Sequence, residues 1–216
     1  MFSRDPTGSG TVTRIRNVPV VLGFHLIITA YGFWLPNDPR GSWSDFVGSW
    51  ELLRFGPATK TTSRRSVAAR PHDVQLRRAA KQALKYPDVH FTDAQVRAVA
   101  RGFADWVRHN GVTIWACSIL SEHAHLVVAR HRYKVEQVAN LLKGASTRAL
   151  LAGGLHPLAK LARPDRRPPK VWAQNQWKVF LDTCPDIRRS IRYVEENPLK
   201  EGGARQHWDW VTRYDG

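Results

Sequence analysis

The sequence lacks any apolar run as long as the ~20 residues that a membrane-spanning helix requires. Its longest candidate, 18–34, is interrupted by His25, by Thr29 and by two glycines. The first ten residues contain no apolar core of the kind that secretory signal peptides carry. Two cysteines, Cys117 and Cys184, cannot build a disulfide framework. These absences exclude a helical membrane protein and a disulfide-stapled secreted domain, and they predict a cytoplasmic protein.

The usual signatures of nucleotide and zinc sites are also missing. The chain contains neither a phosphate-binding GxxxxGKS or GxxxxGKT loop nor a GxGxxG turn, and it has no HExxH segment and no Cys/His cluster. The sequence therefore predicts no nucleotide cofactor and disfavours a zinc hydrolase.

Acidic residues are few relative to basic ones. The 216 residues include 33 Lys and Arg against 18 Asp and Glu, a formal net charge of +15, together with nine Trp, five Tyr and eight Phe. Basic charge combined with many aromatics favours a nucleic-acid partner, because each phosphate contact releases counterions and each exposed ring can stack on a base. A merely solubilising basic surface is the alternative. With 43% hydrophobic residues, the chain is expected to fold as a single domain over residues 1–216.

Hydrophobic periodicity divides the chain into alternating strands and helices. We expect strands at 20–34, 112–120, 123–130 and 177–182, and helices at 92–110, 134–151 and 184–197, the first capped by Thr92 and the last closed by Pro198. This βαββαβ order with a further C-terminal helix predicts an α+β, ferredoxin-like fold, in which an antiparallel sheet has its helices packed on one face.

Two basic segments interrupt this pattern. An insertion at about 36–90 has no regular periodicity, and within it residues 60–85 hold eight Lys or Arg against one acid, Asp73. A Pro-rich linker at about 160–170 adds five more basic residues. Both segments suit a DNA-binding arm or, equally, a solvated loop.

His123 and His125 lie two residues apart in the second strand of the expected hairpin. Alternate side chains of a strand share a face at ~3.3 Å per residue, so the two imidazoles are ~6.6 Å apart on one side and can converge on a cation. Tyr193 and Asn197 are four apart in the last helix and also share a face. Each pair has an ordinary explanation as well: polar strand residues, a packing aromatic and a helix C-cap.

Taken together, these motifs resemble the single-tyrosine HUH transposases, and the REP-associated tyrosine transposases in particular. The shared features are His-Ala-His on a strand and a tyrosine on a later helix, with an Asn-Pro pair one helical turn after the tyrosine. The resemblance covers about 20–34 and 91–199. It implies that His123, His125 and Asn197 hold Mg²⁺ or Mn²⁺. It also implies that Tyr193 attacks a phosphodiester of single-stranded, hairpin-forming DNA and leaves a 5′-phosphotyrosine, in a nucleoid-associated protein. One nucleophile per chain makes a homodimer suitable for two-ended reactions.

Basic and aromatic side chains outside this constellation are candidates for holding the DNA. The predicted phosphate contacts are Lys143, Arg148, Arg64, Arg65, Arg77, Arg78 and Lys170, and the predicted base-stacking residues are Trp34, Trp43, Trp50, Trp172 and Trp177. Trp106 and Trp115 are assigned to the core. Gly144, unusual inside a helix, is explained by a close backbone approach, to the sheet or to DNA.

Two other functions fit parts of the pattern. A βαββαβ sheet also underlies RRM-like modules that bind RNA or single-stranded DNA without cutting it, although no RNP-like aromatic motif is present. A replication-initiator or relaxase-type HUH nickase would share the histidines and the tyrosine, usually on a longer chain.

Overall fold

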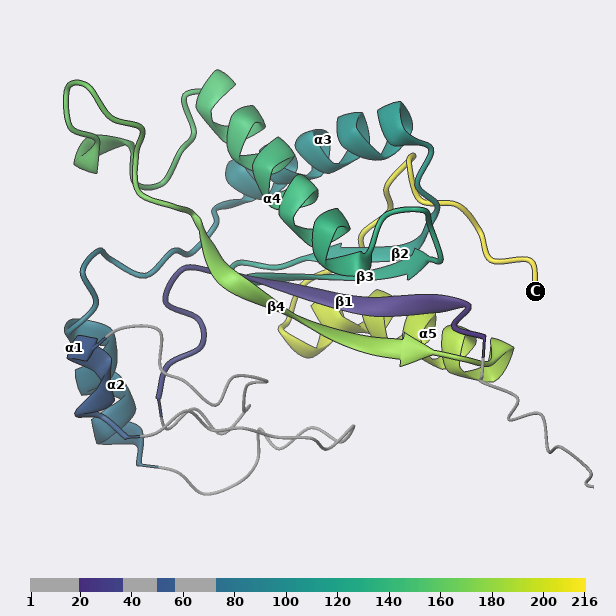
Figure 1. The fold of residues 1–216 in the computed structure, drawn as a ribbon, viewed down its shortest axis with the longest axis horizontal. Coiled ribbons are helices and arrows are strands. Elements are labelled where there is room, and N and C mark those ends of the chain that lie inside the picture. Colours follow the sequence, from purple (N-terminus) through teal and green to yellow (C-terminus); the bar gives the residue numbers. More distant parts are fainter. Residues whose placement is uncertain (1–19, 37–49, 57–72) are drawn as a thin grey trace, which may run out of the picture.

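The computed structural model describes residues 20–36, 50–56 and 73–216 (Figure 1). The elements follow one another as β1 (Gly23–Ala30), α1 (Trp50–Leu53), α2 (Val74–Gln82), α3 (Asp93–Asn110), β2 (Ile114–Ile119), β3 (His123–Ala129), α4 (Val135–Ala152), the short 3₁₀ helix η1 (Ala159–Leu161), β4 (Trp172–Leu181) and α5 (Cys184–Lys200). None of the helices within these described ranges is long and apolar enough to cross a bilayer.

The four strands form one antiparallel sheet in the order β2-β3-β1-β4. The hairpin partner β3 pairs with β1 so that Thr29 lies opposite His123 and Ile27 opposite His125. On its other side, β1 pairs with β4 and places Ile27 opposite Trp177. The predicted antiparallel sheet is confirmed. Strand β1 lies between β3, which carries His123 and His125, and β4, which carries Trp177.

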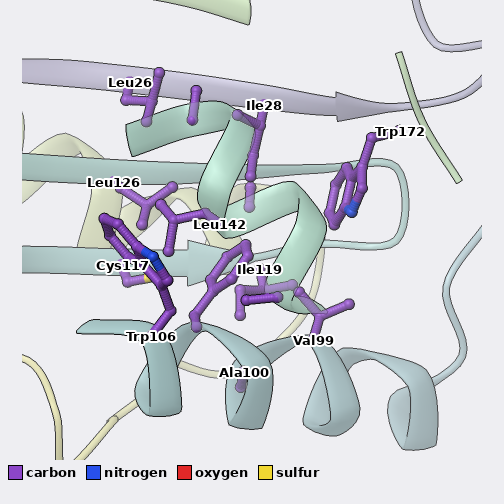
Figure 2. Close-up of a cluster of buried hydrophobic side chains, with 14 of the residues drawn as sticks. Leu26, Ile28, Val99, Ala100, Trp106, Cys117, Ile119, Leu126, Leu142 and Trp172 are labelled. Atoms are coloured by element: carbon purple, nitrogen blue, oxygen red, sulfur yellow. The ribbon is translucent and has the colours of Figure 1, made fainter. Parts of the chain in front are cut away.

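The two faces of the sheet carry different helices (Figure 1). Leu26 and Ile28 of β1 and Leu126 of β3 point to the face covered by α3 and α4, where they form the main core with Phe103 and Leu142. Several of these side chains are seen in Figure 2. The alternate residues face α5, which packs on the opposite side. The expectation of helices on one face therefore holds for α3 and α4, and the additional C-terminal helix, for which no face was predicted, lies on the other face.

Helix α3 begins and ends where the sequence predicts. The Thr92 hydroxyl accepts a hydrogen bond from Gln95 N, and the Gln95 side chain accepts one from Thr92 N, a complete capping box. At the other end Gly111 takes a left-handed conformation with φ of 62°. A left-handed residue is needed to turn the chain into β2, and glycine adopts it without steric cost.

Helix α5 continues beyond its predicted end. The hydroxyl of Thr183 caps its first turn, but Pro198 lies inside the helix, which runs to Lys200. A proline inside a helix removes one hydrogen bond and crowds the carbonyl four residues before it, and in the last turn only that one backbone contact is affected. The chain is turned instead by Gly202, with φ of 79°, and by a hydrogen bond from Gly203 N to the Pro198 carbonyl. The prediction that Pro198 closes the helix was wrong by one turn.

Strand β4 begins five residues earlier than predicted, at Trp172. The Trp172 ring is buried between Phe91 and Phe103, and its Nε1 donates to the Ser146 hydroxyl at 3.0 Å. Its place in the core excludes the predicted role in base stacking. The preceding linker, expected to be irregular, contains the short helix η1.

The basic insertion is partly helical, contrary to the irregular pattern expected. Asp73 caps α2, and Ala80 of that helix packs with Leu35 and Phe55 in a small separate cluster. The remainder of the insertion, with Arg64, Arg65 and Trp43, lies outside the described residues. Trp106 is in the core as predicted, whereas Trp115 is only partly buried, against Tyr214.

The C-terminal segment covers the outer edge of β2. The Gln206 amide exchanges two 2.7 Å hydrogen bonds with the backbone of Ile119, and Thr212 N donates to the Ile114 carbonyl. Between them Trp210 is buried in the main core. These contacts satisfy backbone groups that an edge strand would otherwise leave free for pairing with another chain.

The close helix contact lies at Gly102, and the predicted approach of the sheet to Gly144 is not found; the other alternative for Gly144, an approach of DNA, stays a prediction. A Cβ on Gly102 would lie 2.6 Å from the Ser146 Cα, whereas one on Gly144 would meet only the Arg148 guanidinium at 3.5 Å. The α3–α4 packing therefore requires a glycine in α3.

These two glycines form a matched test. We expect Gly102→Ala to destabilise the protein by about 1–3 kcal/mol, because backbone atoms must move apart. Gly144→Ala should stabilise it by about 0.5–1 kcal/mol, because alanine has the better helix propensity and nothing obstructs its methyl group. Urea unfolding of both variants measures the difference, and a neutral Gly102→Ala would contradict the packing described.

Candidate active site

The two histidines of β3 point to the α5 side of the sheet. His123 and His125 are 9% and 4% exposed, and their ring centroids are 4.8 Å apart. Their neighbours on the adjacent strands at the same level are Thr29 and Ser118. The strand pattern thus brings both imidazoles to one buried polar surface beneath a helix.

Helix α5 lays a row of polar side chains along these histidines. The Tyr193 ring centroid is 5.6 Å from that of His125, and a carboxylate oxygen of Glu201 is 4.0 Å from Nε2 of His123. Asn197, 7% exposed, lies midway between Tyr193 and Glu201 on the helix. Tyr193 and Asn197, four residues apart, are separated by ~6 Å along the helix, which is close to the ~6.6 Å between His125 and His123 along the strand.

A third histidine, His25 on β1, lies in the cluster, although the sequence did not predict it as a site residue. Its Nε2 is 3.0 Å from Nδ1 of His125, and its ring centroid lies 5.6 Å from that of Tyr193. The signal was present in the sequence as a lone imidazole in an otherwise apolar strand. Its relation to His125, one hundred residues away, depends on the pairing of β1 with β3.

Two charged residues at the end of α5, Lys200 and Glu201, also lie at the site and were not predicted from the sequence. The Lys200 ammonium lies 4.5 Å from the Tyr193 ring centroid, close enough for a cation–π contact. Burial, with a smaller contribution from the Glu201 carboxylate, raises the pKa of the Tyr193 phenol above its ordinary value. The raised pKa keeps the phenol protonated at neutral pH in the free protein, and the Tyr193 side chain is 41% exposed.

Several buried polar atoms of this surface have no hydrogen-bond partner within the described part of the chain. They are the hydroxyl oxygens of Thr29 and Ser118 and the amide nitrogen of Asn197. Leaving such an atom unpaired costs about 1–3 kcal/mol, and native proteins keep few of them. Their concentration around His123 and His125 is typical of a surface that receives a polar ligand.

The donor set around Asn197 fits a divalent cation. Burial lowers the pKa of His25 to about 4 and holds the pKa of His125 well below its ordinary value, so both rings are neutral at pH 7. The imidazoles of His123 and His125 with an amide oxygen suit Mg²⁺ or Mn²⁺ once phosphate oxygens and water complete the shell.

Aromatic side chains border the histidines on the side of β1 and β4. The Phe33 ring centroid is 4.9 Å from that of His123, and Trp34 continues from Phe33 toward Trp177, at 6.3 Å. Trp34 and Trp177 are partly buried, in contrast to Trp172 in the core. The described tryptophans beside the site are therefore this pair.

The predicted phosphate contacts fall in different places. Arg77 and Arg78 line a cavity of about 350 Å³ together with Lys81 and Glu122, the residue before His123. Arg148 lines a different cavity, with residues of α3, and so lies on the far face of the sheet. Lys170 is exposed just before β4.

Lys143 is buried instead of facing solvent. Its ammonium donates to the carbonyls of Ala173, Gln174 and Asn175 at 2.9, 3.3 and 2.9 Å. Burial and the nearby Lys170 lower the pKa of Lys143 to about 8. Because all three donor positions are used, this placement favours a structural role, fastening the start of β4 to α4, over the predicted contact with DNA.

A second cluster of metal-type ligands lies at the edge of the sheet. The ligand atoms of Asp88, His90 and Glu122 are within 4.8 Å of one another. The Lys81 ammonium is 2.7 Å from Asp88 and 3.6 Å from Glu122, so it already supplies a cation there. Burial pushes the pKa of Asp88 upward, but hydrogen bonds from Lys81 and His90 outweigh it and the net pKa is lowered. We interpret this cluster as an ion-pair network joining α2 to the hairpin.

Comparison with known proteins gives little further constraint. No protein-family model matches the chain, and no curated protein matches it in sequence. The chain is similar to a solved structure described as a REP-associated tyrosine transposase bound to a REP hairpin. The two sequences are 14% identical, the match covers 87% of this chain and 73% of the other, and the TM-score is 0.43. A crystal structure from Deinococcus radiodurans R1, provisionally assigned as a transposase, has 14% identity, coverage of 88% and 96%, and a TM-score of 0.37. At these values neither similarity establishes a shared activity.

The buried imidazoles make stability depend on pH. The pKa of His25 is lowered on folding, so the unfolded chain binds more protons between about pH 4 and pH 6.5, and stability rises with pH across that window. We expect the free energy of unfolding to fall from pH 7 to pH 5, by up to about 1.4 kcal/mol per pH unit for each such ring. Urea unfolding at several pH values should show a shallower slope for His25→Gln; equal slopes would contradict the burial of a neutral His25.

Proposed function

We propose that this protein is a metal-dependent endonuclease and strand transferase for single-stranded DNA, with Tyr193 as its nucleophile. The observation that carries the proposal is the position of the Tyr193 ring, with its centroid 5.6 Å from that of the buried His125, on a helix whose next turn carries the buried Asn197. An accessible phenol beside a neutral imidazole pair and an amide is a set of groups suited to phosphoryl transfer.

The topology supports this assignment at the level of the fold. The chain order of strands and helices, with β1 between β3 and β4 in an antiparallel sheet, fits a ferredoxin-like arrangement. To that arrangement this chain adds α5 on the second face, and α5 carries the tyrosine. The proposed fold is the one that the resemblance to HUH transposases implies.

His123, His125 and Asn197 would hold the Mg²⁺ or Mn²⁺. When bound, the ion would supply Lewis-acid polarisation of a non-bridging oxygen of the scissile phosphate. These three groups carry no negative charge, so the phosphate itself contributes the anionic ligand. The ring of Phe33 against His123 helps to exclude water from that side of the site.

The chemical step begins at the Tyr193 hydroxyl. Its oxygen attacks the phosphorus, the bond from phosphorus to the 3′ oxygen breaks, and the products are a 5′-phosphotyrosine and a free 3′-hydroxyl, which takes up a proton. Because the raised pKa keeps the phenol protonated in the free protein, the proton must leave when the substrate binds. The Lys200 ammonium, 4.5 Å from the Tyr193 ring centroid, would be a nearby positive charge when negative charge develops on the phenol. Reversal by another 3′-hydroxyl joins strands without a nucleotide cofactor.

Groups that can hold the DNA lie near Glu122 and on the side of the histidines toward β1 and β4. Arg77 and Arg78 line the cavity next to Glu122, where they can contact phosphates. Trp34 and Trp177 are placed to stack on bases that approach the site over β4. The partners proposed are therefore single strands, including those at the foot of a hairpin.

The rival function, an RRM-like binding module, is disfavoured by the position of α5. Such modules stack bases on an open sheet face, whereas here α3 and α4 cover one face and α5 packs on β2, β3 and β4 over the other (Figure 1). A helix in that place leaves the tyrosine, and not the sheet, accessible.

Removal of one hydroxyl group tests the nucleophile. Wild-type protein mixed with labelled single-stranded hairpin DNA and Mg²⁺ or Mn²⁺ should give an SDS-resistant covalent adduct, and Tyr193→Phe should give none. Because the hydroxyl is partly exposed, the variant should fold with nearly unchanged stability. Tyr214→Phe is the matched control and should retain the adduct. An adduct that persists in Tyr193→Phe would remove Tyr193 from its role.

Loss of an imidazole should separate cleavage from binding. We expect His125→Ala to abolish the adduct while single-stranded DNA still binds within a few-fold of wild type and with the same salt dependence, since most phosphate contacts come from Lys and Arg elsewhere. Fluorescence anisotropy at several salt concentrations measures the binding. A parallel loss of binding and cleavage would indicate a role in folding.

A further inference from the structure

His25 lies beside the proposed metal ligands but on the far side of one of them. It makes a 3.0 Å hydrogen bond from ring to ring with His125. We propose that His25 is a positioning residue, which holds the His125 ring so that its Nε2 faces the ion. This inference rests on the proposed function, because it concerns how His123 and His125 bind that ion.

The strand register separates His25 from the ion itself. Thr29 lies opposite His123, and His25 precedes Thr29 by four residues on β1, about 13 Å along the strand at ~3.3 Å per residue. His125 lies between them, with its ring centroid 4.8 Å from that of His123 and 5.2 Å from that of His25. A cation shared by His123 and His125 is therefore on the opposite side of the His125 ring from His25.

The atoms that make the contact determine which nitrogen of His125 is free. Nδ1 of His125 is the atom that meets His25 Nε2, so Nε2 of His125 is the nitrogen left to bind a metal. For that, Nδ1 of His125 must carry the hydrogen and donate it, and His25 Nε2 must accept. Metal-bound histidines commonly donate their second nitrogen to such an acceptor, which fixes both the tautomer and the orientation of the ring.

An imidazole is an unusual choice for the acceptor, because carboxylates and carbonyl oxygens are more common there. A carboxylate at position 25 would add a buried negative charge next to Tyr193, whose ring centroid is 5.6 Å from that of His25. A neutral imidazole accepts the hydrogen bond without that charge, so it does not oppose formation of the tyrosinate.

The test is metal binding by the full chain without DNA. Titration with Mn²⁺, with free Mn²⁺ followed by electron paramagnetic resonance, gives the affinity independently of activity. His25→Phe keeps the ring volume and removes the acceptor, so we expect binding weaker by about 10–100-fold. His25→Gln places an amide oxygen near the position of Nε2 and should restore affinity to within a few-fold of wild type. His109→Phe, at an exposed site on α3, is the matched control.

A spectroscopic measurement separates orientation from general loosening of the structure. In the metal-free proteins, the ¹⁵N resonances of His125 should report a single tautomer with hydrogen on Nδ1 in wild type and in His25→Gln, and a mixture in His25→Phe. Thermal melts of the metal-free proteins establish folding, and His25→Leu serves as the acceptor-free variant should His25→Phe not fold.

The outcomes distinguish this inference from the proposed function. Wild-type affinity in His25→Phe would overturn the positioning role, and so would a His25→Gln variant as weak as His25→Phe, since the imidazole itself would then be needed as a ligand. If His123→Ala binds Mn²⁺ as well as wild type does, the metal site fails, and the proposed function fails with it.

Discussion

The antiparallel packing of α5 against β3 is the constraint on which the candidate site depends. A helix gains ~6 Å in four residues and a strand ~6.6 Å in two, so Tyr193 and Asn197 repeat along α5 at nearly the spacing of His125 and His123 along β3. A change of one residue in this register would turn the helix by about 100° and point the row away. Ile187 and Val194 of α5, both fully buried, hold the register by apolar contact with Ala116 of β2 and Val127 of β3.

Burying a polar surface under a helix lowers the stability of the fold, and the rest of the protein compensates for this loss. Neutral imidazoles and unpaired hydroxyls occupy the α5 side, whereas the face beneath α3 and α4 is almost purely apolar (Figure 2). The larger hydrophobic core therefore supplies the stability that the smaller layer cannot. Gly102 allows the two covering helices to approach closely, and Lys143 fastens β4 to one of them.

Those basic side chains selected from the sequence that the structure describes lie on different sides of the sheet. Arg77 and Arg78 of α2 lie near the start of β3 because the Lys81 ion pairs tie α2 to Glu122. Arg148, on the helical face, is separated from the histidines by the whole sheet. Of the basic residues selected from the sequence and described by the structure, those of α2 are therefore best placed to act with the site.

Much of the local structure could be predicted, because its signals lie within a few residues of one another. The Thr92 capping box, the hairpin and the shared faces of the two motif pairs follow from periods of 3.6 and 2 residues. The errors concern effects that depend on context. Pro198 is tolerated because it lies in the last turn, and Trp172 is buried because two phenylalanines surround it.

The sequence by itself determined the repeating patterns: which residues share the face of a helix or strand, where α3 starts, and that the chain is strongly basic. Tertiary structure alone decided which faces meet. It brought His25 to His125 across one hundred residues, set Tyr193 over both, and turned Lys143 inward. The reason is that periodicity is a property of neighbours along the chain, whereas register and packing depend on all elements of the core at once.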